Sequence, residues 1–411
     1  MNIYTFIMVG FIFIHYIFKT LLDQMNIRAI QTEVPEEFKE TYELEKYKKS
    51  QLYLKDGERF FWIKRTFFLG VTFAVLYSDS LDLLDGFVRG FELSSTLTGL
   101  FYLSLLLLAK MILDVPFSLY HTFVIEQKFG FNKMSLKTFI LDFFKGIILT
   151  AFLGLPLLTL TLWLLGKYPS NAWVYVWAIV SIYQTFLMFV APAVIMPLFN
   201  KFTPLKEGPL KTAIDAYAKE HGFALKGVFT MDGSKRSSKS NAFFTGIGKY
   251  RRIVLFDTLI EQLTTEELMA VLAHEMGHFK KGHILKGMGI SLLTMGLYLW
   301  GLSLCVQYKP FFDALGLSEV SVYLGLVVFS FVISPFQFFM SIFSSIFSRK
   351  NEYEADRYSI ETYKNPESMI SALKKLTVNN LSNLTPHPWK VFFEYSHPPV
   401  KDRIEEIRRL S

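Results

Sequence analysis

Seven apolar stretches most strongly constrain how this 411-residue chain can fold. They lie at residues 3–22, 61–77, 96–114, 139–165, 173–199, 284–305 and 320–348. Each is close to the roughly 20 residues that a helix needs to cross about 30 Å of hydrocarbon. Hydrophobic residues make up 51% of the chain and aromatic residues 17%, which is high for a soluble protein. The sequence therefore predicts a mainly helical membrane protein with seven transmembrane helices.

The basic residues alternate between the segments that connect these stretches. Segments 23–60, 115–138, 200–283 and 349–411 together hold 34 Lys and Arg residues, whereas the three other connections hold 3. Basic residues accumulate on the cytoplasmic side of membranes. We therefore expect the N-terminus outside and the C-terminus in the cytoplasm. This placement accounts for the net charge of +7, so the charge implies no nucleic-acid partner. The first stretch lacks a basic leader and a cleavage site, and we expect it to remain as a helix.

The stretches divide the chain into four parts. Residues 1–199 are expected to form five transmembrane helices with cytoplasmic loops, and residues 200–283 a cytoplasmic catalytic segment. Residues 284–348 are expected to form two more transmembrane helices, and residues 349–411 a second cytoplasmic segment. The helical pair must fold the chain back before the two cytoplasmic parts can share a site.

The first cytoplasmic part is predicted to contain a small sheet and two helices. A helix is expected over 209–221, and β-branched and aromatic residues predict strands at 227–231, 241–247 and 252–257. Gly248-Lys249-Tyr250 is the predicted turn between the last two strands. Thr264 and Glu267 form a capping-box pattern, which predicts a helix from there through His283.

That second helix carries His274-Glu275-Met276-Gly277-His278. Histidines four residues apart lie on one helix face, so both can bind one zinc ion, with Glu275 beside them as general base. The alternative is a chance occurrence on an exposed helix face. Because Cys305 is the one cysteine, a thiolate zinc site is excluded, and any metal must be held by histidines and carboxylates.

The third ligand distinguishes the classes of zinc protease. Ile284 stands where a metzincin would place its third histidine, and Lys281 stands where that motif has glycine, so this class is excluded. Glu352 and Asp356 follow the last apolar stretch and share a helix face. Glu352 can therefore bind zinc while Asp356 accepts the free N–H of a ligating histidine. Without the histidine pair, the same residues would indicate an acidic, solvated helix start.

Several blocks together resemble one family, the integral-membrane CAAX prenyl proteases of the type 1 class. The resemblance covers most of the chain, and the blocks follow the family's order. It implies seven helices that enclose a large water-filled chamber, with a cytoplasmic thermolysin-like domain whose glutamate-ligand site holds one zinc per chain. The blocks are residues 240–246, residues 252–259, the His274 motif with His283, residues 352–356, and residues 396–399 with Arg403.

The resemblance also implies residue roles. His274, His278 and Glu352 correspond to the zinc ligands, Glu275 to the general base and Asp356 to a residue that supports a ligand. His397 and Arg403 are similar to residues near the scissile carbonyl or residues that structure the site, and either could act as an oxyanion donor.

Simpler alternatives stay open for three of the supporting residues. His397 could cap the turn before Pro398-Pro399, and Arg403 could face solvent from an amphipathic helix. His283 could support the site or contact substrate at its rim, or it could be an ordinary helix-end histidine beside Lys280 and Lys281.

Asn241, Ala242 and Phe243 are candidate substrate-binding residues. The predicted strand 241–246 precedes the strand that leads into the zinc helix, so it could lie at the sheet edge beside the metal. An extended peptide could add to this edge through main-chain hydrogen bonds. Alternatively, Asn241 ends a polar loop, and Phe243 and Phe244 pack into the core.

The expected function is a membrane-embedded zinc metalloendopeptidase that acts on prenylated CAAX-type or other membrane-associated peptides and proteins. A site-2-type intramembrane protease would place the motif inside an apolar span, but Glu266, Lys280 and Lys281 surround it here. A non-catalytic zinc-containing channel or scaffold is the other alternative. The compact chain favours a prokaryotic member in a bacterial inner membrane over the endoplasmic reticulum. The expected partners are the substrate and the bilayer, without nucleic acid, and the sequence carries no signal for the oligomeric state.

Overall fold

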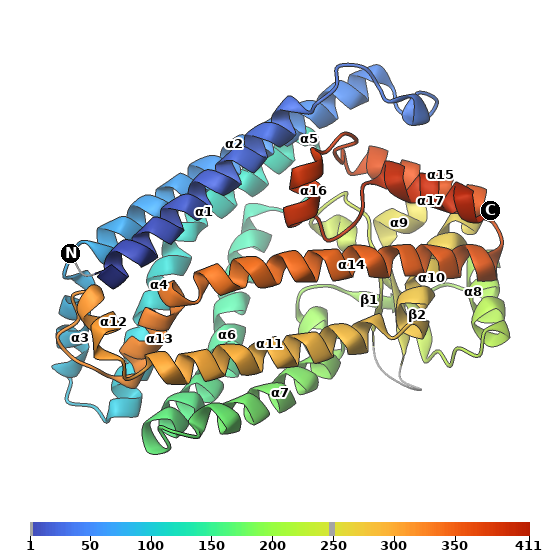
Figure 1. The fold of residues 1–411 in the computed structure, drawn as a ribbon. Helices are drawn as coiled ribbons and strands as arrows, with labels where there is room; N and C mark the ends of the chain where they lie inside the picture. Colours follow the sequence, from blue (N-terminus) through green and yellow to red (C-terminus); the bar gives the residue numbers. More distant parts are fainter. Residues whose placement is uncertain (1–2, 246–250) are drawn as a thin grey trace.

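The computed structural model describes residues 3–245 and 251–411, and long helices dominate it (Figure 1). The long helices are α1 (Ile3–Arg28), α2 (Leu44–Leu76), α4 (Ser95–Tyr120), α6 (Leu136–Lys167), α7 (Ala172–Val190), α11 (His283–Cys305) and α14 (Ser334–Tyr363). The shorter ones are α3 (Ser80–Arg89), α5 (Gln127–Phe129), α8 (Pro209–Glu220), α9 (Asp257–Gln262), α10 (Thr265–Lys280), α12 (Lys309–Ala314), α13 (Val322–Val332), α15 (Pro366–Asn379), α16 (Pro388–Glu394) and α17 (Val400–Leu410).

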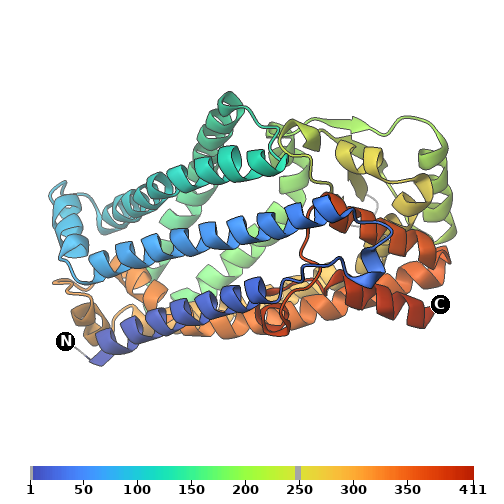
Figure 2. The same ribbon diagram turned by 90° about the horizontal axis from the view of Figure 1, so that it is seen from above.

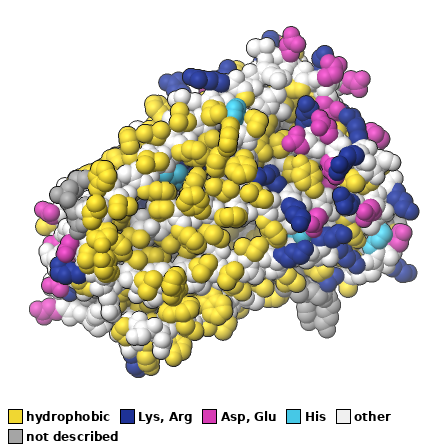
Figure 3. All heavy atoms as spheres, in the orientation of Figure 1, with side chains coloured by type: hydrophobic (Ala, Val, Ile, Leu, Met, Phe, Trp, Pro, Cys, Tyr) yellow, Lys and Arg dark blue, Asp and Glu magenta, His cyan; other side chains and the backbone are white. Residues whose placement is uncertain are grey.

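Within these described residues, five helical segments are long and apolar enough to cross a membrane alone: α1, α4 with its continuation to Phe129, α6, α7 with its continuation to Leu198, and α11. Two bent pairs raise the number to seven if each pair is one span: α2 with α3, at 65°, and α13 with α14, at 56°. Five of the predicted stretches thus lie in single spans, and the second and the last lie in the bent pairs. In Figure 3 hydrophobic side chains cover the surface over the long helices, and charged side chains gather mainly at the end that holds the sheet.

The last predicted stretch, 320–348, is not one straight helix. The chain bends between α13 and α14, where Pro335 occupies the first turn of α14. Proline has no N–H to continue a preceding helix and is tolerated in a first turn. Beyond residue 348, α14 continues without a break to Tyr363. The acidic segment that follows the apolar stretch thus belongs to the same rigid helix.

In the five single spans, buried side chains lie towards the helix ends and not in the middles. In α1 they fall at residues 5–8 and 22–26, in α6 at residues 162–165, and in α7 at Ala172 and Val176. At most 17% of the residues in the apolar windows of the five single spans are buried. A packed bundle would bury an apolar stripe along the full length of each helix. The spanning helices, which run side by side in Figure 2, therefore do not form such a packed bundle along their full length.

A four-stranded sheet lies at one end of the helices. Its order is β1 (Phe202–Pro204), β2 (Gly227–Met231), β4 (Arg252–Phe256) and β3 (Ala242–Thr245). Strands β2 and β4 are parallel, with Phe229 opposite Val254, and the other pairs are antiparallel. The strands predicted at 227–231 and 252–257 are confirmed, and β3 lies within the predicted 241–247. The end of that prediction, 246–247, and the turn Gly248-Lys249-Tyr250 lie outside the described residues.

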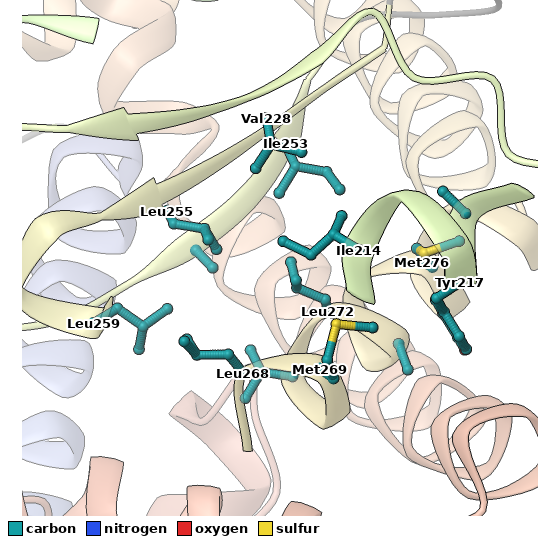
Figure 4. Packing of buried hydrophobic residues seen from close by; sticks show 14 of the residues in the cluster. Ile214, Tyr217, Val228, Ile253, Leu255, Leu259, Leu268, Met269, Leu272 and Met276 are labelled. Atoms are coloured by element: carbon teal, nitrogen blue, oxygen red, sulfur yellow. The ribbon is translucent and has the colours of Figure 1, made fainter. Parts of the chain in front are cut away.

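The core of this domain fixes α10 on the sheet (Figure 4). Leu268, Leu272 and Met276 recur at helical spacing along α10 and pack with Ile253 and Leu255 of β4 in one buried cluster. Fully burying a side chain of this size contributes about 1.5–3 kcal/mol. One face of α10 is thus held by the sheet, which leaves another face for the histidines.

Both ends of α10 are set by local signals. The predicted capping box is present: the Thr264 hydroxyl accepts from the Glu267 N–H at 3.3 Å, and the Thr264 N–H donates to the Glu267 carboxylate at 2.8 Å. The helix ends at Lys280 and not at His283 as predicted. Gly282 adopts a left-handed conformation with φ +69°, which favours glycine, and His283 begins α11.

Candidate active site

The site depends on a close approach between α10 and α14, which run side by side in Figure 1. Gly277 lies at the contact: a Cβ atom there would stand 3.0 Å from Ala355 Cα and 3.0 Å from Tyr358 Cβ. The buried Ser359 hydroxyl donates to the Ala270 carbonyl at 2.9 Å across the same contact. Gly277 thus stands where the two helices nearly touch, and a larger side chain there would force α10 and α14 apart.

This approach brings Glu352 of α14 to the histidine pair of α10. The Nε2 atoms of His274 and His278 lie 3.2 Å apart. Glu352 Oε1 lies 3.2 Å from His278 Nε2, and Glu352 Oε2 lies 3.6 Å from His274 Nε2. His274 and Glu352 are buried. Two imidazoles and one carboxylate thus present their ligand atoms to one point and together could hold a metal ion.

The donor set and its spacing fit zinc. Zinc binds imidazole nitrogen and carboxylate oxygen at about 2.0–2.2 Å in tetrahedral geometry, which separates neighbouring ligand atoms by roughly 3.3–3.6 Å. The three separations of 3.2, 3.2 and 3.6 Å are close to this range. Three protein ligands also leave a fourth position open, as in catalytic sites.

Asp356 supports the first histidine. Its Oδ1 lies 2.8 Å from His274 Nδ1, and it is fully buried one helical turn beyond Glu352. A carboxylate in this position accepts the Nδ1 proton, which leaves the Nε2 lone pair for a metal. The structure thus brings Asp356 to His274, one of the two histidines that the sequence pattern left open for it.

His283 supports the second histidine through a relay. Its Nδ1 lies 3.0 Å from His278 Nδ1, and its Nε2 lies 3.1 Å from Glu354 Oε2. Neutral His283 can donate a hydrogen bond from its Nε2–H to Glu354 and accept one at Nδ1 from the Nδ1–H of His278. The Nε2 lone pair of His278 is then left for a metal. Sequence reasoning missed Glu354, although it lies in the same acidic segment as Glu352.

Arg403 of α17 faces these carboxylates and not solvent. Its guanidinium donates to both Asp356 oxygens, at 2.8 and 2.6 Å, and one nitrogen lies 3.4 Å from Glu352 Oε2. Burial alone would lower the pKa of Arg403, but the neighbouring Asp356 and Glu352 raise it above its ordinary value. The charged guanidinium thus compensates two buried carboxylates. This geometry favours a role in positioning over direct contact with substrate.

His397 is the exposed histidine of the site. Its Nε2 lies 3.5 Å from Glu352 Oε1, and its side chain is 66% exposed, which leaves the ring accessible to a ligand. The preceding chain is held by Arg349, which sequence reasoning missed. Arg349 donates to the carbonyls of Val391 and Tyr395 at 2.9 and 2.6 Å. Arg349 lies one turn before Glu352 on α14, so one helix carries both Glu352 and the support of His397.

Glu275 lies between the two histidines on α10. Burial raises the pKa of its carboxyl group above the ordinary value, and the nearby His274 and His278 oppose that shift. A carboxylate whose pKa is raised accepts a proton more readily near neutral pH. The environment of Glu275 therefore suits a general base.

Asn241, Ala242 and Phe243 lie outside the cluster of histidines and carboxylates, at the edge of the sheet. Asn241 accepts the Phe256 N–H at 3.1 Å, and Phe243 is paired with Val254. Because β3 pairs with one strand only among residues 3–245 and 251–411, its other edge is available there for main-chain hydrogen bonds. Ala242 is buried, and the other two are not.

Comparison with known proteins places this site in its class. Residues 24–201 match the family described as CAAX prenyl protease N-terminal, five membrane helices, and residues 204–411 match peptidase family M48. The CAAX prenyl protease 1 homolog of Oryza sativa is 35% identical over 97% of this chain and 95% of that protein. The human homolog is 31% identical over 96% and 93% of the two chains.

A solved structure agrees with the sequence comparison. The crystal structure of S. mikatae Ste24p superimposes with a TM-score of 0.94 at 30% identity, covering 98% of this chain and 99% of that one. The fold and the site thus define an integral-membrane metalloprotease. More specifically, the chain belongs to the CAAX prenyl protease 1 family.

Proposed function

We propose that this chain is a zinc endopeptidase that cleaves prenylated CAAX-type proteins or peptides, with one zinc held by His274, His278 and Glu352. The observation that carries the proposal is the set of three ligand atoms 3.2–3.6 Å apart, each histidine oriented by its own acceptor. A bound zinc ion would polarise the scissile carbonyl and acidify water. Site-2-type chemistry is not favoured, because α10 lies outside the candidate spans.

The chain's own residues would then perform the proton transfers. Glu275 would accept the proton of the attacking water and return it to the amine that leaves. His397 is the exposed donor that could stabilise the carbonyl oxygen as it gains negative charge. Arg403 and Asp356 would hold His274 and Glu352 in place.

The substrate class is supported by the relatives and by the space beside the site. The relatives are named as CAAX prenyl proteases. A cavity of about 620 Å³ lies between α11 and α14, the two helices that carry His283 and Glu352. Ile290, Met295, Met340, Phe343 and Phe347 are among its lining residues. Such a wall suits the hydrocarbon of a lipidated substrate.

The peptide part would bind at the edge of the sheet. We propose that an extended substrate pairs with β3, so that main-chain hydrogen bonds orient its scissile carbonyl whatever its side chains. Asn241, Ala242 and Phe243 would form this edge. The support is that β3 is terminal in the sheet and packs against α10, the helix that carries the histidines.

The orientation in the membrane follows from charge. With 34 basic residues in one set of connections and 3 in the other, we propose that the N-terminus lies outside and that the active site and C-terminus are cytoplasmic. The bacterial inner membrane that the compact chain favours stays a prediction.

One comparison tests the function. The protein, purified in detergent, is analysed for metal and assayed with a farnesylated peptide and its unlipidated twin. We expect about one zinc per chain and faster cleavage of the farnesylated peptide. Equal cleavage would refute the preference for prenyl groups and leave the protease intact, whereas no cleavage of either peptide by the zinc-loaded protein would contradict the proposed function.

A further inference from the structure

The segment before β3 is docked onto the transmembrane helices. The Lys133 N–H donates to the Arg236 carbonyl at 3.1 Å, and the Ser238 N–H donates to the Phe131 carbonyl at 3.0 Å. Asn132 and Ser237 form an isolated β-bridge between these two hydrogen bonds. Residues 236–240 of the catalytic domain and residues 131–133 between α5 and α6 thus form one small paired structure. The sequence offers no signal for this pairing, because about 100 residues separate the two segments.

Lys239 is the centre of this junction. Its ammonium group lies 2.8 Å from Glu126 Oε2 and 2.8 Å from the Tyr53 hydroxyl, and 4.5 Å from the centre of the Phe131 ring. The Tyr53 hydroxyl donates to the other oxygen of Glu126 at 2.5 Å. An ion pair with Glu126, a second hydrogen bond from the ammonium group to Tyr53 and a cation–π contact therefore fix one side chain.

A π-helical turn presents Glu126 to this lysine. Residues His121–Glu126 form the turn between α4 and α5, and Glu126 is its last residue. The wider turn changes the direction of the side chains that follow, at the expense of regular hydrogen bonding, and such turns are frequent at functional sites. Tyr53 comes from α2, so two transmembrane segments meet at Lys239.

The other side of Lys239 is held by the catalytic domain. Gln262 of α9 donates to the Ser238 carbonyl at 3.3 Å and accepts from the Ser240 hydroxyl at 2.7 Å. The Thr258 hydroxyl donates to the Lys239 carbonyl itself at 3.1 Å. Thr258 and Gln262 belong to α9, which leads directly into α10. The residues that hold this segment therefore lie just before the helix that carries the histidines.

We propose that Lys239 is a positioning residue that sets strand β3 relative to both the transmembrane helices and the metal helix. Its side chain fixes it to Glu126 and Tyr53, its carbonyl is fixed to α9, and Asn241 follows two residues later. The position of the strand edge is thereby tied to α2 and to the turn that follows α4. This inference rests on the proposed role of β3 in binding the peptide.

The test compares Lys239→Met with Lys239→Arg, which retains a cation for Glu126. We expect Lys239→Met and Glu126→Gln to lower kcat/KM roughly tenfold or more, the effect of losing at least one charge-assisted hydrogen bond. The loss should appear mainly in KM, with zinc content and melting temperature close to those of the wild type. Lys239→Arg should restore most of kcat/KM.

Lys128→Met is the matched control. Lys128 of α5 pairs with Asp56 of α2 at 2.6 Å, but this bridge is more exposed than that of Lys239 with Glu126 and includes no residue of 236–240. Wild-type kinetics for this control, with a raised KM for Lys239→Met, would support the proposal. An unchanged KM in Lys239→Met and Glu126→Gln, or an equal loss in Lys128→Met, would overturn it.

Further results distinguish a failure of the proposed role of Lys239 from a failure of the proposed peptide binding at β3. Loss of zinc and of thermal stability in step with activity, without rescue by Lys239→Arg, would show a merely structural role and overturn the proposal. Normal cleavage by the wild type of a substrate N-methylated at the paired amides would instead refute the role of β3. An unchanged KM in Lys239→Met together with poor cleavage of that substrate would refute the lysine's role alone.

Discussion

The carboxylate of Asp356 lies 2.8 Å from Nδ1 of His274. Asp356 is fully buried on α14, and its two oxygens also accept both hydrogen bonds from Arg403. A buried carboxylate with these partners stays ionised and holds the imidazole in one tautomer. The pair therefore links the α17 arginine to the orientation of a candidate zinc ligand.

Asp356→Asn should weaken zinc binding by roughly 10–100-fold, the usual effect of losing a residue that orients a ligand. An amide cannot hold the Nδ1 proton as strongly, and it leaves Arg403 without one of its acceptors. Zinc affinity is measured by competition with a chelator. Glu405→Gln, in an exposed pair with Lys401 at 3.7 Å, is the control and should bind zinc normally. Unchanged affinity in Asp356→Asn would mean that the aspartate only contributes to packing.

Glu275→Gln should abolish turnover and retain about one zinc per chain. Glutamine cannot accept the proton of water, but the three metal-binding side chains stay in place. His278→Ala, which removes one of those side chains, should lose both metal and activity. Metal analysis and a peptidase assay on the same samples decide between the roles. Loss of zinc from Glu275→Gln would contradict its assignment as a base that does not bind the metal.

Gly277→Ala should loosen the contact between α10 and α14. The added methyl group would lie 3.0 Å from backbone and side-chain atoms of α14, so the helices must separate by a few tenths of an ångström. Overpacking of this kind costs about 1–3 kcal/mol. We expect a lower melting temperature and weaker zinc binding, because Glu352 moves with α14. Gly289→Ala, whose Cβ would meet nothing within 4 Å, is the control. Equal behaviour of the two variants would show that the contact tolerates a methyl group.

Local patterns predicted the elements that local physics determines. The apolar stretches, the capping box at Thr264 and the strands 227–231 and 252–256 follow from composition and periodicity over a few residues. Strand β1 was missed because it has three residues and ends in Pro204, too short for an alternating pattern. The π-helical turn has no local signal, and the helix expected for Glu352 and Asp356 proves to be continuous with the last span.

The site could be predicted in part for the same reason. Histidine spacing on one helix predicted that His274 and His278 face one point, and the structure brings both together with Glu352. The contact of Arg403 with Asp356 joins residues 47 positions apart, and that of His283 with Glu354 joins residues 71 apart. No local pattern encodes such contacts. The contact of His283 with Glu354 arises because α11, α13 and α14 fold the chain back on itself, and that of Arg403 with Asp356 because α17 returns to α14.

The termini should lie on opposite sides of the membrane. In sealed spheroplasts or vesicles whose lumen is the cytoplasmic side, a C-terminal tag should be protected from protease and an N-terminal tag accessible. The reason is the imbalance of 34 basic residues against 3 across the two sets of connections. If both tags lay on one side, the chain would have one membrane crossing fewer than the seven predicted. The bent pair of α2 with α3 would then be the segment that does not cross.

The last prediction concerns Asn241 and the edge of the sheet. The Asn241 carbonyl accepts the Phe256 N–H at 3.1 Å, and its side-chain oxygen accepts the Ala242 N–H at 2.8 Å. The side chain thus shapes the start of β3. Asn241→Ala should raise KM or lower kcat/KM, because an edge whose first residue is less well fixed pairs less well with a peptide. Zinc content and melting temperature should stay close to wild type.

The substrate offers the complementary test of this edge. A peptide N-methylated at the amides that pair with β3 cannot donate those hydrogen bonds, so it should be cleaved poorly by the wild type. A peptide methylated at amides that point away from the strand has the same composition and should be cleaved normally. Normal kinetics for Asn241→Ala and for both peptides would assign β3 to the core alone. Substrate binding would then have to be sought around His397, the exposed side chain 3.5 Å from Glu352.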